Sequence, residues 1–211
     1  MAENYRVKQG DCISSIAFEK GFFPDTIWNH SENKNLKDAR EDPNVLLPGD
    51  IVHIPDKRLK EVSEPTNQVY KYKVKNTPAY LHLILKFGGE PLKNEPYILE
   101  IGDEKIEGKV DAEGKLRVPL SPDIKSAKLT VGETGRELQY TLDLGQLDPI
   151  DEIFGFKKRL YNLGYDPGKL DASTNDDFEN AIRAFEADNK LEPTGRIGDE
   201  NKKKLKELYG R

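Results

Sequence analysis

The chain has 211 residues and a formal net charge of −5, with 33 basic side chains scattered among 38 acidic ones. Nucleic-acid binding needs a concentration of Lys and Arg that neutralises phosphates, so this charge balance argues against it. Hydrophobic residues make up 36% of the chain and are clustered, and the length is typical of two or three small domains. The single cysteine, Cys12, excludes an internal disulfide and a cysteine-rich zinc site.

No apolar segment marks the sequence as targeted or membrane-spanning. The first residues, Met-Ala-Glu-Asn-Tyr-Arg-Val, lack the apolar core of a secretory signal peptide. No apolar run reaches the ~20 residues that cross a bilayer. We therefore expect cytoplasmic synthesis without a signal peptide. Arrival at a cell wall then requires a route other than general secretion, or a signal that is missing from this sequence.

Residues 1–56 are predicted to fold in the order strand, helix, helix, strand. An alternating strand at 5–7 is followed by a turn at Gly10. We expect Asp11 to cap the first helix and Gly21 to end it in the left-handed conformation. A second helix is expected near Pro24, and a closing strand at 51–55. Apolar residues stand at helical spacing in the two helices: Ile13, Ile16, Ala17, Ile27 and Trp28.

Two motifs in this segment together resemble the LysM family. They are Tyr5-Arg6-Val7-Lys8-Gln9-Gly10-Asp11 and Leu47-Pro48-Gly49-Asp50-Ile51-Val52-His53-Ile54-Pro55. LysM domains bind polymers that contain N-acetylglucosamine, peptidoglycan or chitin, through the turn after the first strand and the turn before the second. The resemblance therefore implies a glycan site at Gly10, Asp11, Cys12, Ile13, Val45, Leu46, Leu47 and Pro48.

The chemistry of such turns suits an amino sugar. An acetamido group offers one donor and one acceptor that turn backbone can match, while apolar sugar faces pack on Leu or Ile side chains. The sequence departs from the family at Cys12, where a hydroxyl residue is usual, and at the long polar stretch 29–40. That stretch either lengthens the groove or blocks it. The alternative is that both turns only connect elements.

Residues 57–66 are polar and are predicted to be a linker, followed by a β-rich zone at 67–146. Short strands separated by turn sequences are typical of an antiparallel β-sandwich. They are expected around 70–74 (Tyr70, Tyr72 and Val74), 81–87, 97–101, 106–110, 116–120, 127–131 and 138–144.

The runs 89–97 and 108–116 in this zone resemble the carboxypeptidase-regulatory, or transthyretin-like, domain. The resemblance implies a structural spacer without chemistry of its own. Asp111 and Glu113 raise the alternative of a calcium site, but calcium takes about six to eight oxygens from several residues. We expect a solvated turn there and predict no metal site.

Residues 147–211 are predicted to form three short helices. Asp148 and Pro149 are expected at the start of the first, which Gly164 ends. The second is expected to begin at Thr174 and the third at Asp199. Their apolar faces carry Ile153, Phe156, Leu160 and Leu163, then Phe178, Ile182 and Phe185, then Leu205 and Leu208.

The runs 160–165, 170–171, 181–186 and 191–197 resemble the peptidoglycan-binding-domain-1 family, a three-helix module found beside wall hydrolases. The family's glycine-containing turn is replaced by Asp171-Ala172-Ser173-Thr174-Asn175, and its usual Gln after Phe185 by Glu186. The apolar spacing is kept, so we expect the fold. A second glycan surface is expected at Tyr161, Tyr165 and Asp171, where the two tyrosines either stack on sugars or pack on the core.

No catalytic constellation is expected. His30, His53 and His82 lie in different elements, without His-x-x-x-His spacing or three converging zinc ligands. Pairing of the first and last strands of the LysM-like segment makes a dyad of Cys12 and His53 conceivable, but Cys12 begins a helix and is expected to point partly inward. We predict a non-enzyme without cofactors.

The sequence thus predicts a multidomain α+β protein: a LysM domain at 1–56, a linker at 57–66, a transthyretin-like sandwich at 67–146 and a three-helix module at 147–211. Its expected function is non-catalytic binding of peptidoglycan or a chitin-like glycan, with two weak contacts reinforcing each other. The arrangement is similar to LysM proteins that accompany type VI secretion and other contractile injection systems, whose spike or effector proteins are expected partners and a delivery route. The alternative is an adaptor that docks such a protein without binding glycan.

Overall fold

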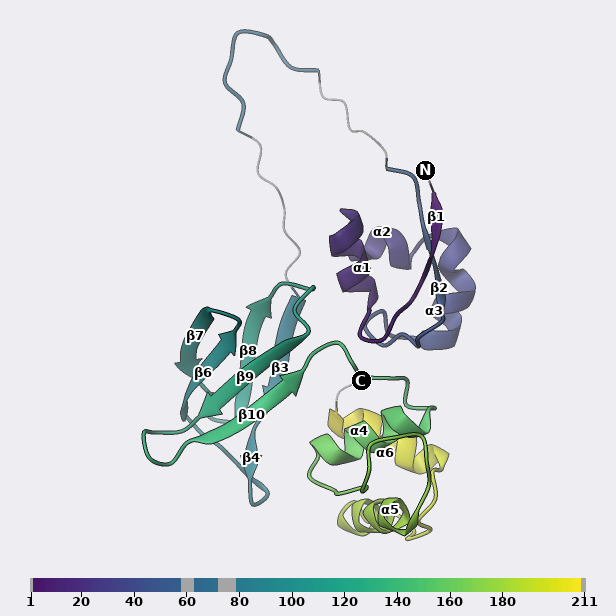
Figure 1. Cartoon of the computed structure of the whole chain (residues 1–211), viewed down its shortest axis with the longest axis vertical. Coiled ribbons are helices and arrows are strands. Elements are labelled where there is room, and N and C mark those ends of the chain that lie inside the picture. The colour runs from purple at the N-terminus through teal and green to yellow at the C-terminus, as the bar shows by residue number, and fades with distance from the viewer. Residues whose placement is uncertain (1, 58–62, 72–78, 210–211) are drawn as a thin grey trace.

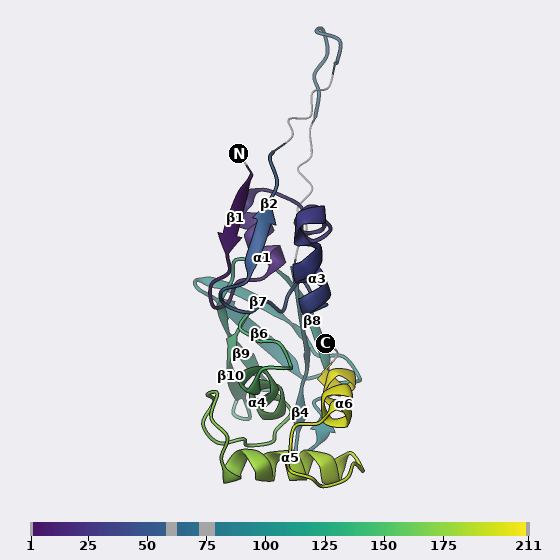
Figure 2. The same ribbon diagram turned by 90° about the vertical axis from the view of Figure 1, so that its right-hand side faces the viewer.

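The computed structural model describes residues 2–57, 63–71 and 79–209 (Figure 1). As expected, the fold is mixed α+β, with antiparallel sheets and several helices. Within the described residues, buried apolar side chains gather into three separate clusters, at residues 7–54, 85–131 and 150–205. Figure 1 shows the part formed around residues 7–54 above the other two parts, which lie side by side, and in Figure 2 these two overlap below it. We call them the first, middle and third parts.

The first part begins and ends on a pair of antiparallel strands. β1 (Glu3–Arg6) pairs with β2 (Ile51–Ile54), placing Tyr5 opposite Val52. The helices between them are α1 (Ile13–Lys20), α2 (Pro24–Trp28), the 3-10 helix η1 (Ser31–Asn33) and α3 (Lys34–Arg40). The predicted order is therefore observed, but the polar stretch 29–40 adds η1 and α3, which the sequence analysis did not predict. The core consists of Val7, Ile13, Ile16, Ala17, Ile27, Trp28, Leu46, Val52 and Ile54.

The cap of α1 is Cys12, so the prediction that Asp11 caps this helix is wrong. The Cys12 Sγ accepts a hydrogen bond from the Ser15 N–H at 3.4 Å, and the Ser15 Oγ accepts one from the Cys12 N–H at 3.0 Å. The Asp11 carboxylate is instead used one turn earlier, where it accepts from the Lys8 N–H. Cys12 therefore fills the capping role of a hydroxyl residue. Gly21 ends α1 with a φ of 71°, as predicted.

The middle part contains three antiparallel sheets. The largest has the strand order β10-β9-β6-β7, and β3–β8 and β4–β5 form two-stranded sheets. The strands are β3 (Ala79–Ile84), β4 (Lys86–Phe87), β5 (Glu90–Pro91), β6 (Pro96–Ile101), β7 (Glu104–Lys109), β8 (Lys115–Leu120), β9 (Ser126–Val131) and β10 (Leu138–Asp143). β6, β8 and β9 all place side chains in the same buried cluster, which includes Leu99, Val118 and Leu129.

Two predicted strands of this zone differ from what the structure shows. The strand expected at 81–87 is divided into β3 and β4 because the chain changes partner at Leu85. The Leu85 N–H donates to the Gly114 carbonyl at 2.8 Å, in register with β8, while the Leu85 carbonyl accepts from the Leu92 N–H at 2.9 Å, next to the β4–β5 pair. The strand expected at 70–74 is only partly covered. Tyr72 and Val74 lie outside the described residues, and Tyr70 does not belong to a strand.

The third part consists of α4 (Ile153–Asn162), α5 (Asp176–Asp188) and α6 (Asp199–Tyr209). α6 begins at Asp199 as predicted, but the predicted starts of the other two helices are wrong. α4 begins after Glu152, because the Asp148 and Pro149 carbonyls accept hydrogen bonds from Arg159 and Glu152 in a preceding turn. α5 is capped by Asn175, whose Oδ1 accepts from the Phe178 N–H at 3.0 Å. The core consists of Ile150, Phe156, Leu160, Phe178, Ala181, Ile182, Phe185 and Leu205.

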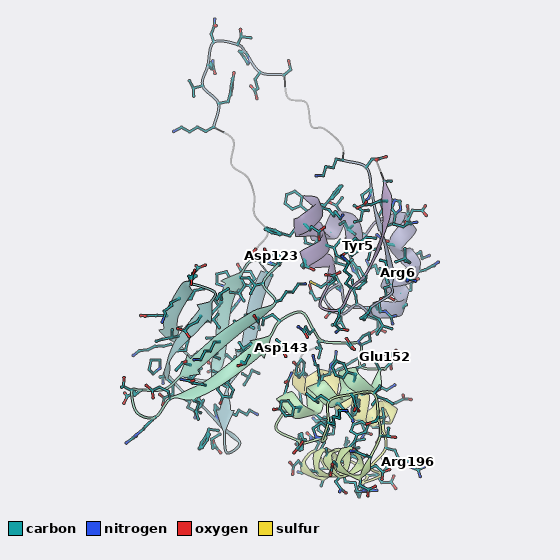
Figure 3. All side chains as sticks on the ribbon, viewed as in Figure 1. Tyr5, Arg6, Asp123, Asp143, Glu152 and Arg196 are labelled. Atoms are coloured by element: carbon teal, nitrogen blue, oxygen red, sulfur yellow. The ribbon has the colours of Figure 1, made fainter. Side chains whose placement is uncertain are left out.

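A connecting segment, residues 144–151, brings the three parts together. It runs from Asp143, the last residue of β10, to Glu152, which precedes α4 (Figure 3). From the first part, the Gln9 Nε2 donates to the Asp148 Oδ1 at 3.2 Å, and Glu41 forms an ion pair with Lys206 at 3.3 Å. In the parts of the chain that the structure describes, no helix has the length and hydropathy needed to cross a membrane.

Candidate functional site

The turn after β1 is held by the Asp11 carboxylate. Its Oδ2 accepts from the Tyr5 hydroxyl at 2.8 Å and from the Lys8 N–H at 2.9 Å (Tyr5 is labelled in Figure 3). Burial raises the pKa of Tyr5, and the hydrogen bond to Asp11 and its negative charge add to this, so that the pKa reaches about 12. The Asp11 carboxylate therefore stabilises this turn through two hydrogen bonds.

The turn before β2 is held in the same way by Asp50. Its carboxylate accepts from the Leu47 N–H at 2.9 Å and forms a two-pronged ion pair with Arg40, at 2.7 Å from Nε and 2.8 Å from Nη2. Burial alone raises the pKa of Asp50, but the hydrogen bonds from Arg40 and Leu47 outweigh it and leave the pKa below its usual range. Arg40 is thus a site residue that the sequence analysis missed. Its signal is a cation ten residues before the Asp of a Pro-Gly-Asp turn.

The two turns lie side by side, as a site built from both requires. The Ile13 N–H donates to the Pro43 carbonyl at 2.8 Å, and the Ser14 Oγ donates to the Asn44 Oδ1 at 3.0 Å. On the strand side, the Gly49 N–H donates to the Val7 carbonyl at 2.9 Å. Backbone hydrogen bonds therefore fix the distance between the turns.

The eight predicted glycan-binding residues differ in their exposure. The side chains of Ile13, Val45 and Leu46 are buried, with exposed fractions of 0%, 6% and 4%. Gly10 is also buried, Asp11, Cys12 and Leu47 are half-buried, and Pro48 is exposed. Only Leu47 and Pro48 can therefore offer an apolar side chain to a sugar, while the buried residues can contribute through backbone groups alone.

Gly10 is covered by the middle part and the connecting segment. The Lys125 Nζ donates a hydrogen bond to the Gly10 carbonyl and lies 3.6 Å from the Asp11 Oδ1. On the other side, a Cβ added to Gly145 would lie 3.1 Å from the Gly10 oxygen. In this arrangement the Gly10 carbonyl is used within the protein, and an acetamido group can reach it only after displacing Lys125.

The stretch 29–40 braces the first part. Asn33 is 1% exposed; its Nδ2 donates to the carbonyls of Ile27 and His53 at 2.8 Å each, and its Oδ1 accepts from the His53 N–H at 2.7 Å. The His30 and His53 rings stack with their centroids 4.8 Å apart. These contacts tie η1 to β2, and Arg40 at the end of α3 ties the stretch to the second turn.

The residues predicted for a second glycan surface differ in their exposure and in their contacts. Tyr161 on α4 is 55% exposed. Tyr165 packs edge-on against Phe185, with centroids 5.5 Å apart, and its hydroxyl donates to the Asp188 Oδ2 at 3.1 Å. Of the two tyrosines, Tyr161 is the one whose ring is open to stack on a sugar.

Asp171, the third of these residues, sits in a turn with two lysines. It accepts from the Ser173 N–H at 2.9 Å and lies 3.3 Å from the Lys169 Nζ and 3.6 Å from the Lys157 Nζ. The hydrogen bonds from Ser173 and the charge of Lys169 hold the pKa of Asp171 well below its usual range. Its carboxylate therefore stays ionised and organises the turn that replaces the family's glycine-containing one.

Glu186, the other departure from the family pattern, is fully buried. It accepts hydrogen bonds from the Thr194 Oγ1 at 2.6 Å, the Asn201 Nδ2 at 2.8 Å and the Gly195 N–H at 2.9 Å. Burial alone raises the pKa of Glu186, but these hydrogen bonds outweigh it and leave the pKa below its usual range. The carboxylate therefore joins α5 to α6 and to the loop between them.

Two buried cations on α4 were also missed by the sequence analysis. Lys157 is 0% exposed; its Nζ donates to the Lys169 carbonyl at 2.9 Å and lies 5.0 Å from the centre of the Phe178 ring. Arg159 is 2% exposed, and its Nη1 donates to the carbonyls of Asp148 and Gly155. Burial lowers the pKa of Arg159. Both cations bind mainly backbone oxygens, which carry no sequence signal.

The groups considered for catalysis or metal binding are engaged elsewhere. The Cys12 Sγ caps α1, and the His53 Nδ1 lies 3.2 Å from the Asn4 Oδ1. Among residues 2–57, 63–71 and 79–209, no group of three or more His, Cys, Asp and Glu side chains is placed to hold a metal ion. The structure thus does not bring Cys12 and His53 together as a dyad.

A pocket of about 320 Å³ lies in the middle part, away from the predicted site residues. Apolar and charged side chains both line it, namely Phe87, Leu92, Glu95, Val131, Gly132, Glu133, Arg136 and Leu138. None of the residues predicted to contact glycan belongs to this lining.

Comparison with known proteins identifies one segment. No curated protein and no solved structure matches the chain significantly. Residues 151–205, which contain α4, α5 and most of α6, match the model of the PG_binding_1 family, described as a peptidoglycan binding domain. A PG_binding_1 peptidoglycan-binding domain is therefore found at residues 151–205 of this chain.

Proposed function

We propose that this protein binds peptidoglycan without catalysing a reaction on it. The observation that carries the proposal is the peptidoglycan-binding domain found at residues 151–205. Its buried polar network around Glu186 gives it a defined loop between α5 and α6, and Tyr161 offers an exposed ring for a sugar face. Aromatic and apolar side chains with a few fixed polar groups are what carbohydrate recognition uses.

In this proposal the first part, residues 1–56, is a LysM domain that supplies a second glycan contact. Its support is the pair of adjacent turns, which are linked by the Ile13 to Pro43 hydrogen bond and braced by Asp11 and Asp50. The turn backbone and the side chains of Leu47 and Pro48 are the groups that would meet a glycan. Residues 57–66 are a linker, and residues 67–146 are a β-sandwich that acts mainly as a spacer. Two weak sites on one chain raise the apparent affinity.

The absence of catalysis is part of the proposal. It is supported by the engagement of Cys12 in a helix cap and of His53 with Asn4 and Asn33. A zymogram on peptidoglycan-containing gels checks it directly. Clearing by the purified chain would refute the non-catalytic assignment.

Retention on insoluble peptidoglycan tests the binding function. The purified chain should sediment with sacculi, and Tyr161→Ala should reduce the retained fraction several-fold. Leu208→Ala is the matched control, because Leu208 is also exposed, at 42%, and lies on a different helix of the third part. Leu47→Asp probes the first part. Leu46 and Ile13 are unsuitable because both are core residues. A wild-type chain that stays in the supernatant would refute the proposal.

A second candidate function is an adaptor that docks a secreted effector or spike protein. The observation that favours it is the covering of Gly10 by Lys125 and Gly145, which leaves the Gly10 carbonyl engaged within the protein. Both candidates agree with delivery by a contractile injection or type VI secretion system, and this route rests on the resemblance of the three-part arrangement. Co-purification of an injection-machine protein together with failure to sediment with sacculi would favour the adaptor.

A further inference from the structure

One face of the β3–β8 sheet is exposed along its whole length. The register pairs Tyr80 with Pro119, His82 with Arg117 and Ile84 with Lys115, and all six side chains are exposed. The alternating residues of the same strands, such as Leu81 and Val118, pack in the core. We call these six residues the β3–β8 outer face.

The composition of this face is unusual for the chain. It combines apolar and aromatic side chains with two cations and a histidine, and it contains no carboxylate, although the chain carries a net charge of −5. The outer face of the neighbouring four-stranded sheet is the natural comparison. There the signs alternate, and Glu100 and Lys105 form an ion pair at 2.6 Å. The four-stranded sheet thus presents an ordinary solvated face, whereas the β3–β8 outer face is complementary to an anion.

Arg117 is held in place on this face by stacking on Tyr80. Its guanidinium carbon lies 3.8 Å from the centroid of the Tyr80 ring, so the planar group rests on the aromatic face. Among the residues that the structure describes, neither Arg117 nor Lys115 forms an ion pair. A guanidinium positioned in this way keeps its N–H edge free, and that edge matches the two oxygens of a carboxylate.

The size of the face indicates a small, extended ligand. Each strand has six residues, which span roughly 20 Å at about 3.3 Å per residue. Two strands are too narrow for the ~800 Å² per partner that a stable protein–protein interface buries. A short peptide with free carboxylates and small apolar groups fits both the dimensions and the charge.

We propose that the β3–β8 outer face binds the carboxylates of the short peptide stems of peptidoglycan. Arg117 and Lys115 contact the carboxylates, and Tyr80 and Ile84, which are 41% and 56% exposed, contact the apolar groups. This inference rests on the proposed function, because it assigns to the middle part a contact with the same polymer. The middle part is then a third binding surface as well as a spacer.

The test uses the full chain and a synthetic stem tripeptide, Ala-γ-D-Glu-Lys, without any sugar. The tripeptide should perturb the amide resonances of β3 and β8, and the affinity should fall with added salt. Arg117→Glu combined with Lys115→Glu should weaken binding at least tenfold. The matched control is Lys109→Glu combined with Lys128→Glu, which makes the same change of net charge on the outer face of the four-stranded sheet. Retained amide protection at Leu81 and Leu83 shows that β3 is folded in each variant.

Two results would overturn the inference: no binding of the tripeptide by the wild-type chain, or equal losses in the two double variants. Neither depends on the sedimentation assay with sacculi. A chain that sediments with sacculi but ignores the tripeptide contradicts this inference alone. A chain that binds the tripeptide through Arg117 but does not sediment contradicts the proposed function and leaves the peptide contact standing.

Discussion

Replacing Glu186 by alanine should open the loop between α5 and α6. The change removes the acceptors of three hydrogen bonds at once, while the Gly195 N–H and the Asn201 amide stay buried. Each buried donor left unsatisfied costs ~1–3 kcal/mol, so the two together cost roughly 2–6 kcal/mol. That is a large fraction of the ~5–15 kcal/mol that stabilises a whole domain.

Glu186→Gln is the matched variant, because it keeps the shape and one acceptor oxygen. Thr194 and Asn201 both bond to the Oε1 atom, and the amide oxygen of glutamine can replace it. The amide nitrogen then faces the Gly195 N–H, so one bond is lost, at about 1–3 kcal/mol. The expected order of stability is Glu, then Gln, then Ala.

Native-state hydrogen exchange on the full chain measures these changes locally. A loss of about 2–6 kcal/mol corresponds to at least a thirtyfold faster exchange of the core amides of α5, since ~1.4 kcal/mol is a factor of ten. The Leu99 amide in the middle part is the internal control. Rates in the alanine variant within about threefold of wild type, or equal rates in the two variants, would refute the reasoning.

The pH dependence gives a second signature of the same network. Because the folded-state pKa of Glu186 lies below its usual value of 4.5, its contribution is complete above that value and is lost as the pH falls through the folded-state pKa. The glutamine variant has no carboxylate to protonate, so this acid sensitivity of the third part should be weaker in it.

Three further predictions concern the first part and its junction. Arg40→Ala should lower the free energy of unfolding by ~1.5–3 kcal/mol, because the charged hydrogen bonds to Asp50 are lost. Urea unfolding followed by the fluorescence of Trp28, the single and buried tryptophan, measures this change, and an unchanged midpoint would contradict it. Because the pKa of Asp50 is lowered, the wild-type advantage over Arg40→Ala should persist at neutral pH and disappear in acid. Cys12→Ser should retain the α1 cap, whereas Cys12→Ala should lower the free energy of unfolding by ~0.5–2 kcal/mol. The same unfolding curves should therefore show the serine variant to be more stable than the alanine variant. Lys125→Ala should speed exchange at the covered turn and increase retention on sacculi, and loss of retention would instead assign Lys125 to the glycan contact.

Segments with a strong apolar period could be predicted from the sequence. Phe178, Ile182 and Phe185 lie on one buried face of α5, and Gly21 ends α1, because spacing and backbone freedom are local properties. α3 could not be predicted in this way. It contains only Leu36 and Ala39 as apolar residues and is held by the ion pair of Arg40 with the distant turn.

Helix starts were less predictable, because a good capping residue can be used elsewhere. Asp11 and Asp148 both have the right chemistry for a cap, but Asp11 binds the Lys8 N–H and Asp148 belongs to the junction with Gln9. The cover over the candidate site could not be predicted from the sequence either. The cover over Gly10 comes from Lys125, 115 residues away, and a pair so distant leaves no periodic signal.

The connecting segment has a consequence for recombination of these parts. A cut at the predicted boundary between residues 146 and 147 would divide it next to Gln146, whose carbonyl accepts from the Lys158 Nζ at 2.9 Å. A Cβ on Gly10 would lie 3.5 Å from the Gln146 side chain, so the same cut also disturbs the first part. Fragments excised at this boundary, or shuffled into other chains, should therefore lose contacts that neither fragment can rebuild.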